Sequence, residues 1–124
     1  MTEPTHYILN SLRTRAFPAR LVTENDGERT VFNLAKSEVQ TFDADGAPVG
    51  YDPFNVNGLQ TPLLVTPDHP LVERLLAESE AARLSKEVHS AMRQFNENVT
   101  EENLAALHEA VEIFGRASLK IFSL

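Results

Sequence analysis

The sequence predicts an α+β fold, in which a small antiparallel β-sheet or open barrel of about five short strands precedes a long antiparallel two-helix hairpin. Two observations predict it. Short β-prone runs separated by turn residues fill residues 17–66, and apolar residues at helical spacing fill residues 67–124. The chain has 124 residues, of which 42% are hydrophobic, so we expect a single domain over residues 1–124.

A hairpin is the clearest element of the β unit (residues 17–66). The dipeptide Asp26-Gly27 separates two β-prone runs, residues 19–24 and residues 29–34. Asp-Gly between such runs favours a tight turn, because glycine adopts a positive φ without steric cost. The sequence therefore predicts that these two runs pair as antiparallel strands.

The other β elements are shorter. Turn-forming residues 44–47 separate residues 38–43 from residues 48–52, which predicts a second hairpin, and residues 63–66 predict a further strand. Residues 6–12 fit a strand and a helix equally well, so the sequence leaves their conformation open.

The first predicted helix spans residues 68–97. The segment Thr66-Pro67-Asp68 offers capping oxygens and a proline near the first turn. Apolar residues then recur at intervals of three and four, which keeps them on one side of a helix. These residues are Ala81, Leu84, Val88, Ala91 and Phe95. Leu71, Val72, Leu75 and Leu76 lie outside this group, and we expect them to cover the sheet.

The second predicted helix begins at Thr100, whose hydroxyl can accept a hydrogen bond from a free N–H group of the first turn. Its apolar residues repeat the same spacing, and we expect them to face the first helix: Leu104, Leu107, Val111 and Phe114. The connection between the helices, residues 96–99, is short, and short connections make neighbouring helices antiparallel. The sequence thus predicts a helical hairpin over residues 67–124.

Charge and composition disfavour several classes of function. The net charge is −7, whereas affinity for nucleic acid comes mainly from Lys and Arg that neutralise phosphates. The chain has no cysteine, which excludes disulfides and thiolate sites. Residues 1–10 do not resemble a signal peptide, and 18 consecutive apolar residues occur nowhere. We expect a soluble, cytoplasmic protein with no membrane partner, for which a nucleic-acid partner is disfavoured.

No motif for catalysis is present. The patterns GxSxG, GxGxxG and GxxxxGK[ST] are absent, so we expect neither an enzyme nor a cofactor. Residues 43–46 resemble the start of a calcium loop, but Pro48 and Phe54 replace the glycine and glutamate that such a loop needs. This segment is predicted to be an ordinary hairpin turn.

Three residues of the helical part could form a metal site. In the predicted antiparallel pairing, His89 and His108 fall at about the same level, and Glu112 lies one turn beyond His108. Two histidines and one carboxylate can hold a transition metal. No third histidine or HExxH spacing supports such a site, so surface histidines are the favoured interpretation.

The apolar residues of the hairpin exceed what a two-helix arm can hide, and such surfaces mark association sites. We expect a non-enzymatic interaction or assembly protein that binds a protein partner, and a homodimer through the hairpin is the simplest closed arrangement. Folding of the C-terminal residues onto the sheet within one chain is the alternative. The candidate interaction residues are Leu107, Phe114, Leu119, Ile121, Phe122 and Leu124.

Two further functions stay open. The acidic stretch 24–52 could mimic nucleic acid and inhibit a basic nucleic-acid-binding protein. Alternatively, the β unit could be a barrel that binds a small ligand or nucleic acid. The residues expected to serve such a barrel are Arg13, Arg15, Arg20, Phe17, Phe32 and Tyr51.

Three segments carry a resemblance to a group of known proteins. Val49-Gly50-Tyr51-Asp52-Pro53-Phe54 follows the second hairpin, Val65-Thr66-Pro67-Asp68-His69-Pro70 opens the first helix, and Val99-Thr100-Glu101-Glu102-Asn103-Leu104 opens the second. Together they resemble small accessory proteins encoded by tailed phages of actinobacteria, over residues 30–112. The resemblance implies a host-directed or virion-associated interaction role and transfers no catalytic residue.

Overall fold

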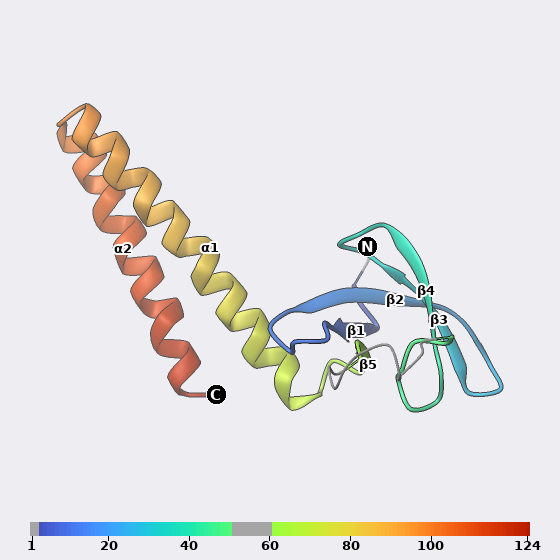
Figure 1. Cartoon of the computed structure of the whole chain (residues 1–124). Helices are drawn as coiled ribbons and strands as arrows, with labels where there is room; N and C mark the ends of the chain where they lie inside the picture. Colours follow the sequence, from blue (N-terminus) through green and yellow to red (C-terminus); the bar gives the residue numbers. More distant parts are fainter. Residues whose placement is uncertain (1–2, 51–60) are drawn as a thin grey trace. The chain divides into compact units, whose positions relative to one another are not determined.

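The computed structural model describes residues 3–50 and 61–124 and has an α+β fold, which confirms the predicted class (Figure 1). The chain divides into two compact units, Met1–Leu75 and Leu76–Leu124, here named the sheet unit and the hairpin unit. The described elements are β1 (His6–Leu9), β2 (Ala16–Asn25), β3 (Glu28–Asn33), β4 (Glu38–Phe42), β5 (Leu63–Val65), α1 (Pro70–Glu97) and α2 (Glu101–Phe122).

The strands form one antiparallel sheet in the order β4-β3-β2-β1-β5. The predicted hairpin around Asp26-Gly27 is confirmed, since β2 and β3 pair up to Asn25 opposite Glu28. Asp26 and Gly27 both have positive φ values, of 53° and 85°. Two positive φ values are what a two-residue turn needs to match the twist of its flanking strands.

The sheet differs from the prediction in two places. The undecided segment 6–12 begins with a strand, His6–Leu9, which lies between β2 and β5 although it precedes the β unit predicted over residues 17–66. The predicted strand over residues 48–52 is wrong, because only a single bridge joins Phe42 to Pro48. Proline has no N–H group with which to extend a ladder. The last two residues of that predicted strand lie outside the described residues.

A glycine joins the two ends of the sheet into a curled half-barrel. The carbonyl oxygen of Gly46, in the loop after β4, accepts a hydrogen bond of 2.9 Å from the Leu64 N–H group in β5. Gly46 has a φ of +89°, and a Cβ atom there would lie 2.7 Å from the Leu64 carbonyl oxygen. Only glycine satisfies both the dihedral angle and the close approach.

Alternation along the strands gives the sheet two apolar faces. One face holds the buried residues Ile8, Ala19, Val31, Phe42 and Leu64. The other face holds Leu9 and Val65, against which Val72 and Leu75 of α1 are buried and Leu71 packs. The predicted cover of the sheet is therefore confirmed for three of its four residues, whereas Leu76 is exposed.

The start of α1 differs in detail from the prediction. Nδ1 of His69 accepts a hydrogen bond of 3.1 Å from the Leu71 N–H group, and Pro70 is the first helical residue. The predicted capping segment 66–68 lies one turn too early, although the Thr66 hydroxyl does donate to Asp68 Oδ1. A proline in the first turn costs no helical hydrogen bond, which explains why the helix begins at Pro70.

The predicted start of α2 is confirmed. The hydroxyl oxygen of Thr100 accepts a hydrogen bond of 3.1 Å from the Asn103 N–H group. The side-chain amide of Asn103 donates in turn to the carbonyl oxygen of Asn98, over 2.8 Å. These bonds join the end of the interhelical turn to the first turn of α2.

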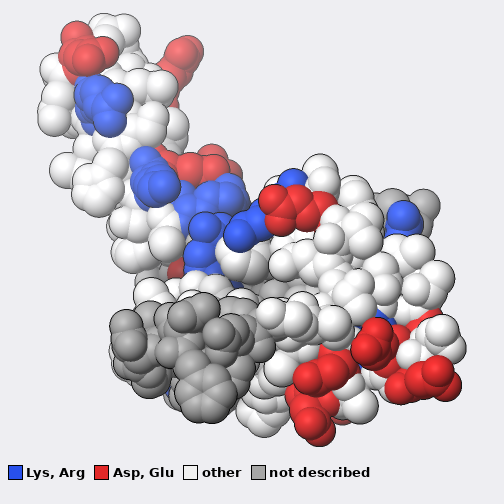
Figure 2. Space-filling view, turned by 45° about the vertical axis from the view of Figure 1, so that its right-hand side comes forward, with Lys and Arg blue, Asp and Glu red and all other residues white. Residues whose placement is uncertain are grey.

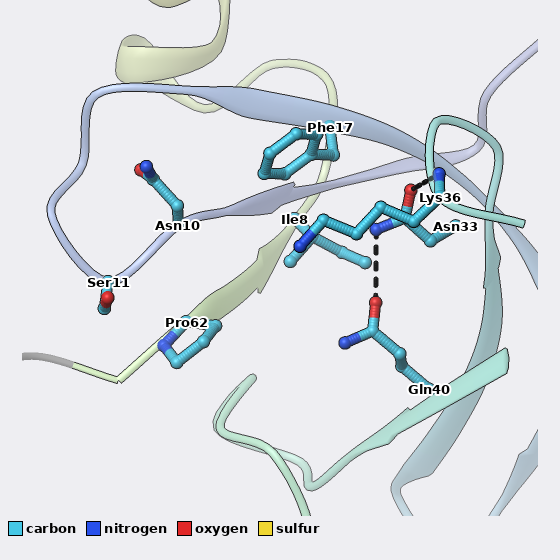
Figure 3. A pocket seen from close by; sticks show the side chains of 8 residues that line it. All are labelled: Ile8, Asn10, Ser11, Phe17, Asn33, Lys36, Gln40 and Pro62. Atoms are coloured by element: carbon cyan, nitrogen blue, oxygen red, sulfur yellow. Dashed lines mark hydrogen bonds between the residues drawn. The ribbon is translucent and has the colours of Figure 1, made fainter. Parts of the chain in front are cut away.

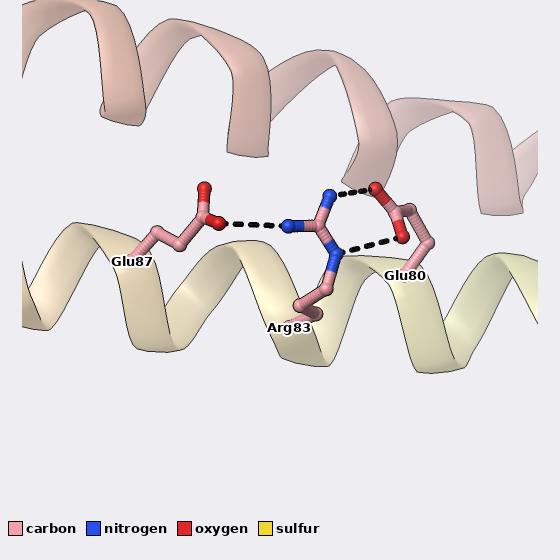
Figure 4. Close-up of polar contacts among 3 residues, drawn as sticks. All are labelled: Glu80, Arg83 and Glu87. Atoms are coloured by element: carbon pink, nitrogen blue, oxygen red, sulfur yellow. Dashed lines mark hydrogen bonds and ion pairs between the residues drawn. The ribbon is translucent and has the colours of Figure 1, made fainter.

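The two helices of the hairpin unit run antiparallel side by side (Figures 1 and 4). Ala81 and Leu84 are buried and Val88, Ala91 and Phe95 are half-buried, so the apolar side predicted for α1 is confirmed. An exposed ion-pair network lies on the same helix, where Arg83 binds Glu80 with two nitrogens and Glu87 over 2.7 Å (Figure 4). Exposed pairs of this kind contribute little to stability.

Candidate functional site

The six predicted interaction residues fall into two groups. Leu107, Phe114 and Ile121 are half-buried within the hairpin unit. Leu119, Phe122 and Leu124 are exposed, and Phe122 retains 87% of its accessible surface. The half-buried residues are thus engaged inside the unit, whereas the exposed ones remain available to a partner.

The exposed fractions of its side chains show that α2 has a second apolar side, which does not face α1. Leu104 and Val111, which were predicted to face α1, are 38% and 48% exposed. Asn103 and Ala110, one position earlier in each case, are half-buried instead. The covered side of α2 therefore differs from the predicted one by one residue at these two positions. Polar Asn103 and small Ala110 are covered in place of Leu104 and Val111.

Four exposed residues define what we name the α2 stripe: Leu104, Val111, Leu119 and Phe122. Intervals of 7 and 11 residues separate Leu104, Val111 and Phe122 and correspond to about two and three helical turns, which returns the side chains to one side. Ile113 lies on the opposite side of the helix. Leu119 lies beside this line, with His108 between them, and Glu112, seven residues before Leu119, borders the stripe, where it is paired with Arg116.

The helix that carries this stripe has no buried residue along its whole described length. Two packed helices alone cover only one side of each other, so the remaining apolar side needs another element. The α2 stripe is therefore apolar, like the residues of a protein core, but no part of the hairpin unit covers it.

The sheet unit contains a pocket of about 190 Å³ (Figure 3). Its apolar lining consists of Ile8, Phe17 and Pro62, and its polar lining consists of Asn10, Ser11, Asn33, Lys36 and Gln40. Sequence reasoning did not find this pocket, because its residues come from four strands and three connecting segments that only the sheet order brings together.

Asn33 organises the polar wall of the pocket. Its side chain is 2% exposed, and its Oδ1 accepts hydrogen bonds of 3.0 Å from the N–H groups of both Ala35 and Lys36. Its Nδ2 donates to Oε1 of Gln40 over 3.2 Å (Figure 3). A buried amide with satisfied partners fixes the turn that presents Lys36 and the rotamer of Gln40.

Two cations lie over one aromatic ring beside the pocket. The Lys36 ammonium and the Arg15 guanidinium are each 5.0 Å from the centre of the Phe17 ring. That distance is within the range of cation–π attraction. The structure thereby brings Arg15 and Phe17 together, as the hypothesis of a ligand-binding barrel requires.

The other residues of that hypothesis do not join this group. Arg13 donates 2.7 Å hydrogen bonds to the carbonyl oxygens of Asn10 and Thr61, which connects the β1–β2 loop to the segment before β5. Arg20 is exposed, Phe32 is half-buried, and neither lines the pocket. Tyr51 lies outside the described residues.

The sequence raised two possible metal sites, the calcium-like loop at residues 43–46 and the group His89, His108 and Glu112. Oδ1 of Asp43 accepts hydrogen bonds from the N–H groups of Asp45 and Ala47, so this carboxylate closes a turn as predicted. Nδ1 of His89 lies 2.9 Å from the Ser85 carbonyl oxygen of its own helix. Within residues 3–50 and 61–124, no three His, Asp or Glu side chains gather as a metal site.

Acidic side chains gather at one end of the sheet unit (Figure 2). The loop before β3 and the loop after β4 approach there, since a Cβ atom on Gly27 would lie 3.2 Å from the Ala44 Cβ atom. Asp26 lies in the first loop and Glu28 begins β3, and the second loop carries Asp43 and Asp45. An acidic cluster without a bound group does not identify a partner.

Neither α1 nor α2 has an apolar stretch sufficient to cross a bilayer, among the residues that the structure describes. Comparisons with models of protein families, with curated proteins and with solved structures produce no match to this chain. The α2 stripe and the pocket of the sheet unit are therefore the two surfaces of the described chain with the features of a binding site.

Proposed function

We propose that this protein is a non-enzymatic assembly protein that forms a homodimer through the α2 stripe. One observation carries the proposal: α2 has no buried residue, yet Leu104, Val111, Leu119 and Phe122 form an exposed apolar row along it. Exposed apolar rows on small proteins mark association surfaces.

A second copy is the partner that the composition of the stripe favours. A two-fold interface uses the same surface of both chains, so that surface must be complementary to itself. The four residues of the α2 stripe are uncharged, and the Glu112 carboxylate that borders Leu119 is ion-paired with Arg116 of the same helix. Two hairpins that meet along this side form a four-helix bundle, which covers both stripes.

The expected affinity is modest. Full burial of a Val, Leu or Phe side chain stabilises by about 1.5–3 kcal/mol, and the stripe residues other than Phe122 already lose part of their surface to the hairpin. Association costs on the order of 4–15 kcal/mol in lost freedom, so eight such side chains leave a small net gain. The dimer should therefore be sought at tens to hundreds of micromolar, on the order of the affinities that this gain allows.

Light scattering coupled to size exclusion tests the proposal with the full chain. The wild type should elute with the mass of two chains, and Val111→Asp should elute with the mass of one. Ile113→Asp is the matched control, because it adds the same charge to an exposed position on the opposite side of α2 and should stay dimeric. A wild type with the mass of one chain at all of these concentrations would overturn the proposal.

A further inference from the structure

The pocket of the sheet unit shares no residue with the α2 stripe, and its lining has the chemistry of a ligand site. Ile8, Phe17, Asn33 and Gln40 line it from four different strands on one face of the sheet. Val72 and Leu75 of α1 are buried on the other face, so the start of α1 does not fill the pocket.

The hydrogen-bond network leaves donors turned toward the pocket. Because Asn33 Oδ1 accepts from two backbone N–H groups, its other terminal atom must be the nitrogen, which donates to Gln40. The atom of Gln40 that receives this bond must then be the oxygen. Two N–H donors on Gln40 Nε2 remain, and no described residue accepts from them.

Charge adds to this excess of donors. Lys36 Nζ and the Arg15 guanidinium gather at the Phe17 ring, and no carboxylate in the described ranges pairs with either of them. None of the lining residues is acidic. Lys36 itself lines the pocket, so its ammonium group would attract an anion bound there.

The apolar lining and the volume set the size of the ligand. Ile8, Phe17 and Pro62 provide a wall without hydrogen-bonding side chains. The pocket measures about 190 Å³, and a cavity of about 150 Å³ is sufficient for benzene. We infer that the pocket binds a small organic anion, whose carboxylate or phosphate group faces Lys36 and Gln40 and whose short apolar body lies against Phe17 and Ile8.

Titration with benzoate and phenyl phosphate, followed by amide NMR spectra of the full chain, tests this inference. Either anion should shift the Gln40 side-chain amide and the backbone amides of Ser11 and Lys36 in a saturable way. The tighter of the two probes identifies the preferred acidic group. Benzamide, which has the same ring without the charge, should bind at least about tenfold more weakly, as expected for loss of a charged hydrogen bond.

Paired variants locate the site. Lys36→Met should weaken binding of the better anion about tenfold, and Gln40→Leu should weaken it less, because Gln40 is uncharged. Lys86→Met, in exposed α1, changes the net charge equally and should leave binding unchanged. The inference fails if neither anion saturates the pocket resonances, if benzamide binds equally well, or if Lys36→Met and Lys86→Met behave alike. None of these results bears on the mass of the dimer.

Discussion

Asn33 and Gln40 are joined by a 3.2 Å side-chain hydrogen bond, with the Asn33 amide nitrogen as donor. Asn33 is the one buried polar residue of the described core, and the bond connects the end of β3 to β4. It also separates the roles of the two residues. Both terminal atoms of the Asn33 amide are bonded within the protein, whereas no described residue accepts from Gln40 Nε2.

Asn33→Ala should destabilise the sheet unit by about 1–3 kcal/mol, because two backbone N–H groups and Gln40 lose their partner. Gln40→Ala should cost less, since it removes one bond at a half-buried position. Urea unfolding followed by tyrosine fluorescence measures both values. Tyr7 lies in β1, residues 76–124 contain no tyrosine and the chain has no Trp, so the hairpin unit adds nothing to this signal. Equal losses would contradict the role given to Asn33.

Gly46→Ala should destabilise the sheet unit by about 2 kcal/mol or more. The substitution meets both an unfavourable positive φ and the Leu64 carbonyl oxygen at 2.7 Å. Gly50→Ala is the control, because Gly50 has a φ of +79° but no atom within 4 Å of the added Cβ. The same fluorescence measurement should show the smaller loss for Gly50→Ala, and a reversed order would contradict closure of the half-barrel through Gly46.

His6 makes the sheet unit sensitive to mild acid. Burial, with a further contribution from the Arg29 charge and against that of Glu24, lowers the pKa of His6 below its ordinary value. In the window from about pH 6.5 down to the lowered pKa, the unfolded state therefore binds more protons than the folded state. The free energy of unfolding should rise with pH across this window and should fall on acidification.

His6→Gln isolates this effect. Glutamine cannot titrate, so the difference in unfolding free energy between wild type and variant should change between pH 7 and pH 5, with the wild type losing more on acidification. The Thr5 hydroxyl lies 3.0 Å from His6 Nδ1, and protonation of that nitrogen removes its capacity to accept from the hydroxyl. A difference that stays constant with pH would show that His6 does not titrate in the folded state at a lowered pKa.

Local signals predicted much of the fold, since the Asp26-Gly27 turn and the Thr100 cap each depend on neighbouring residues. The strand His6–Leu9 could not be assigned in the same way. It is only four residues long, and it is a strand because it pairs with β2 and with the distant β5. Pairing across such a sequence separation leaves no short-range pattern.

The candidate sites were likewise predictable only where neighbouring residues in the sequence determine them. The exposed C-terminal residues Leu119 and Phe122 could be predicted from composition, whereas Leu104 and Val111 were assigned to the covered side of α2. A one-residue rotation is hard to detect when a polar residue such as Asn103 occupies a covered position. The pocket escaped prediction because an ordinary Asn and an ordinary Gln acquire their roles only through the β3–β4 register.

Cross-linking at Gly115 tests the central claim most directly. Gly115 lies between Val111 and Leu119 near the middle of the stripe, a Cβ atom there meets nothing within 4 Å, and the chain has no native cysteine. With a short bismaleimide, Gly115→Cys should give a cross-linked dimer in high yield, whereas Ile113→Cys should react without joining two chains. Equal yields from both variants, or no dimer from Gly115→Cys, would contradict association through the α2 stripe.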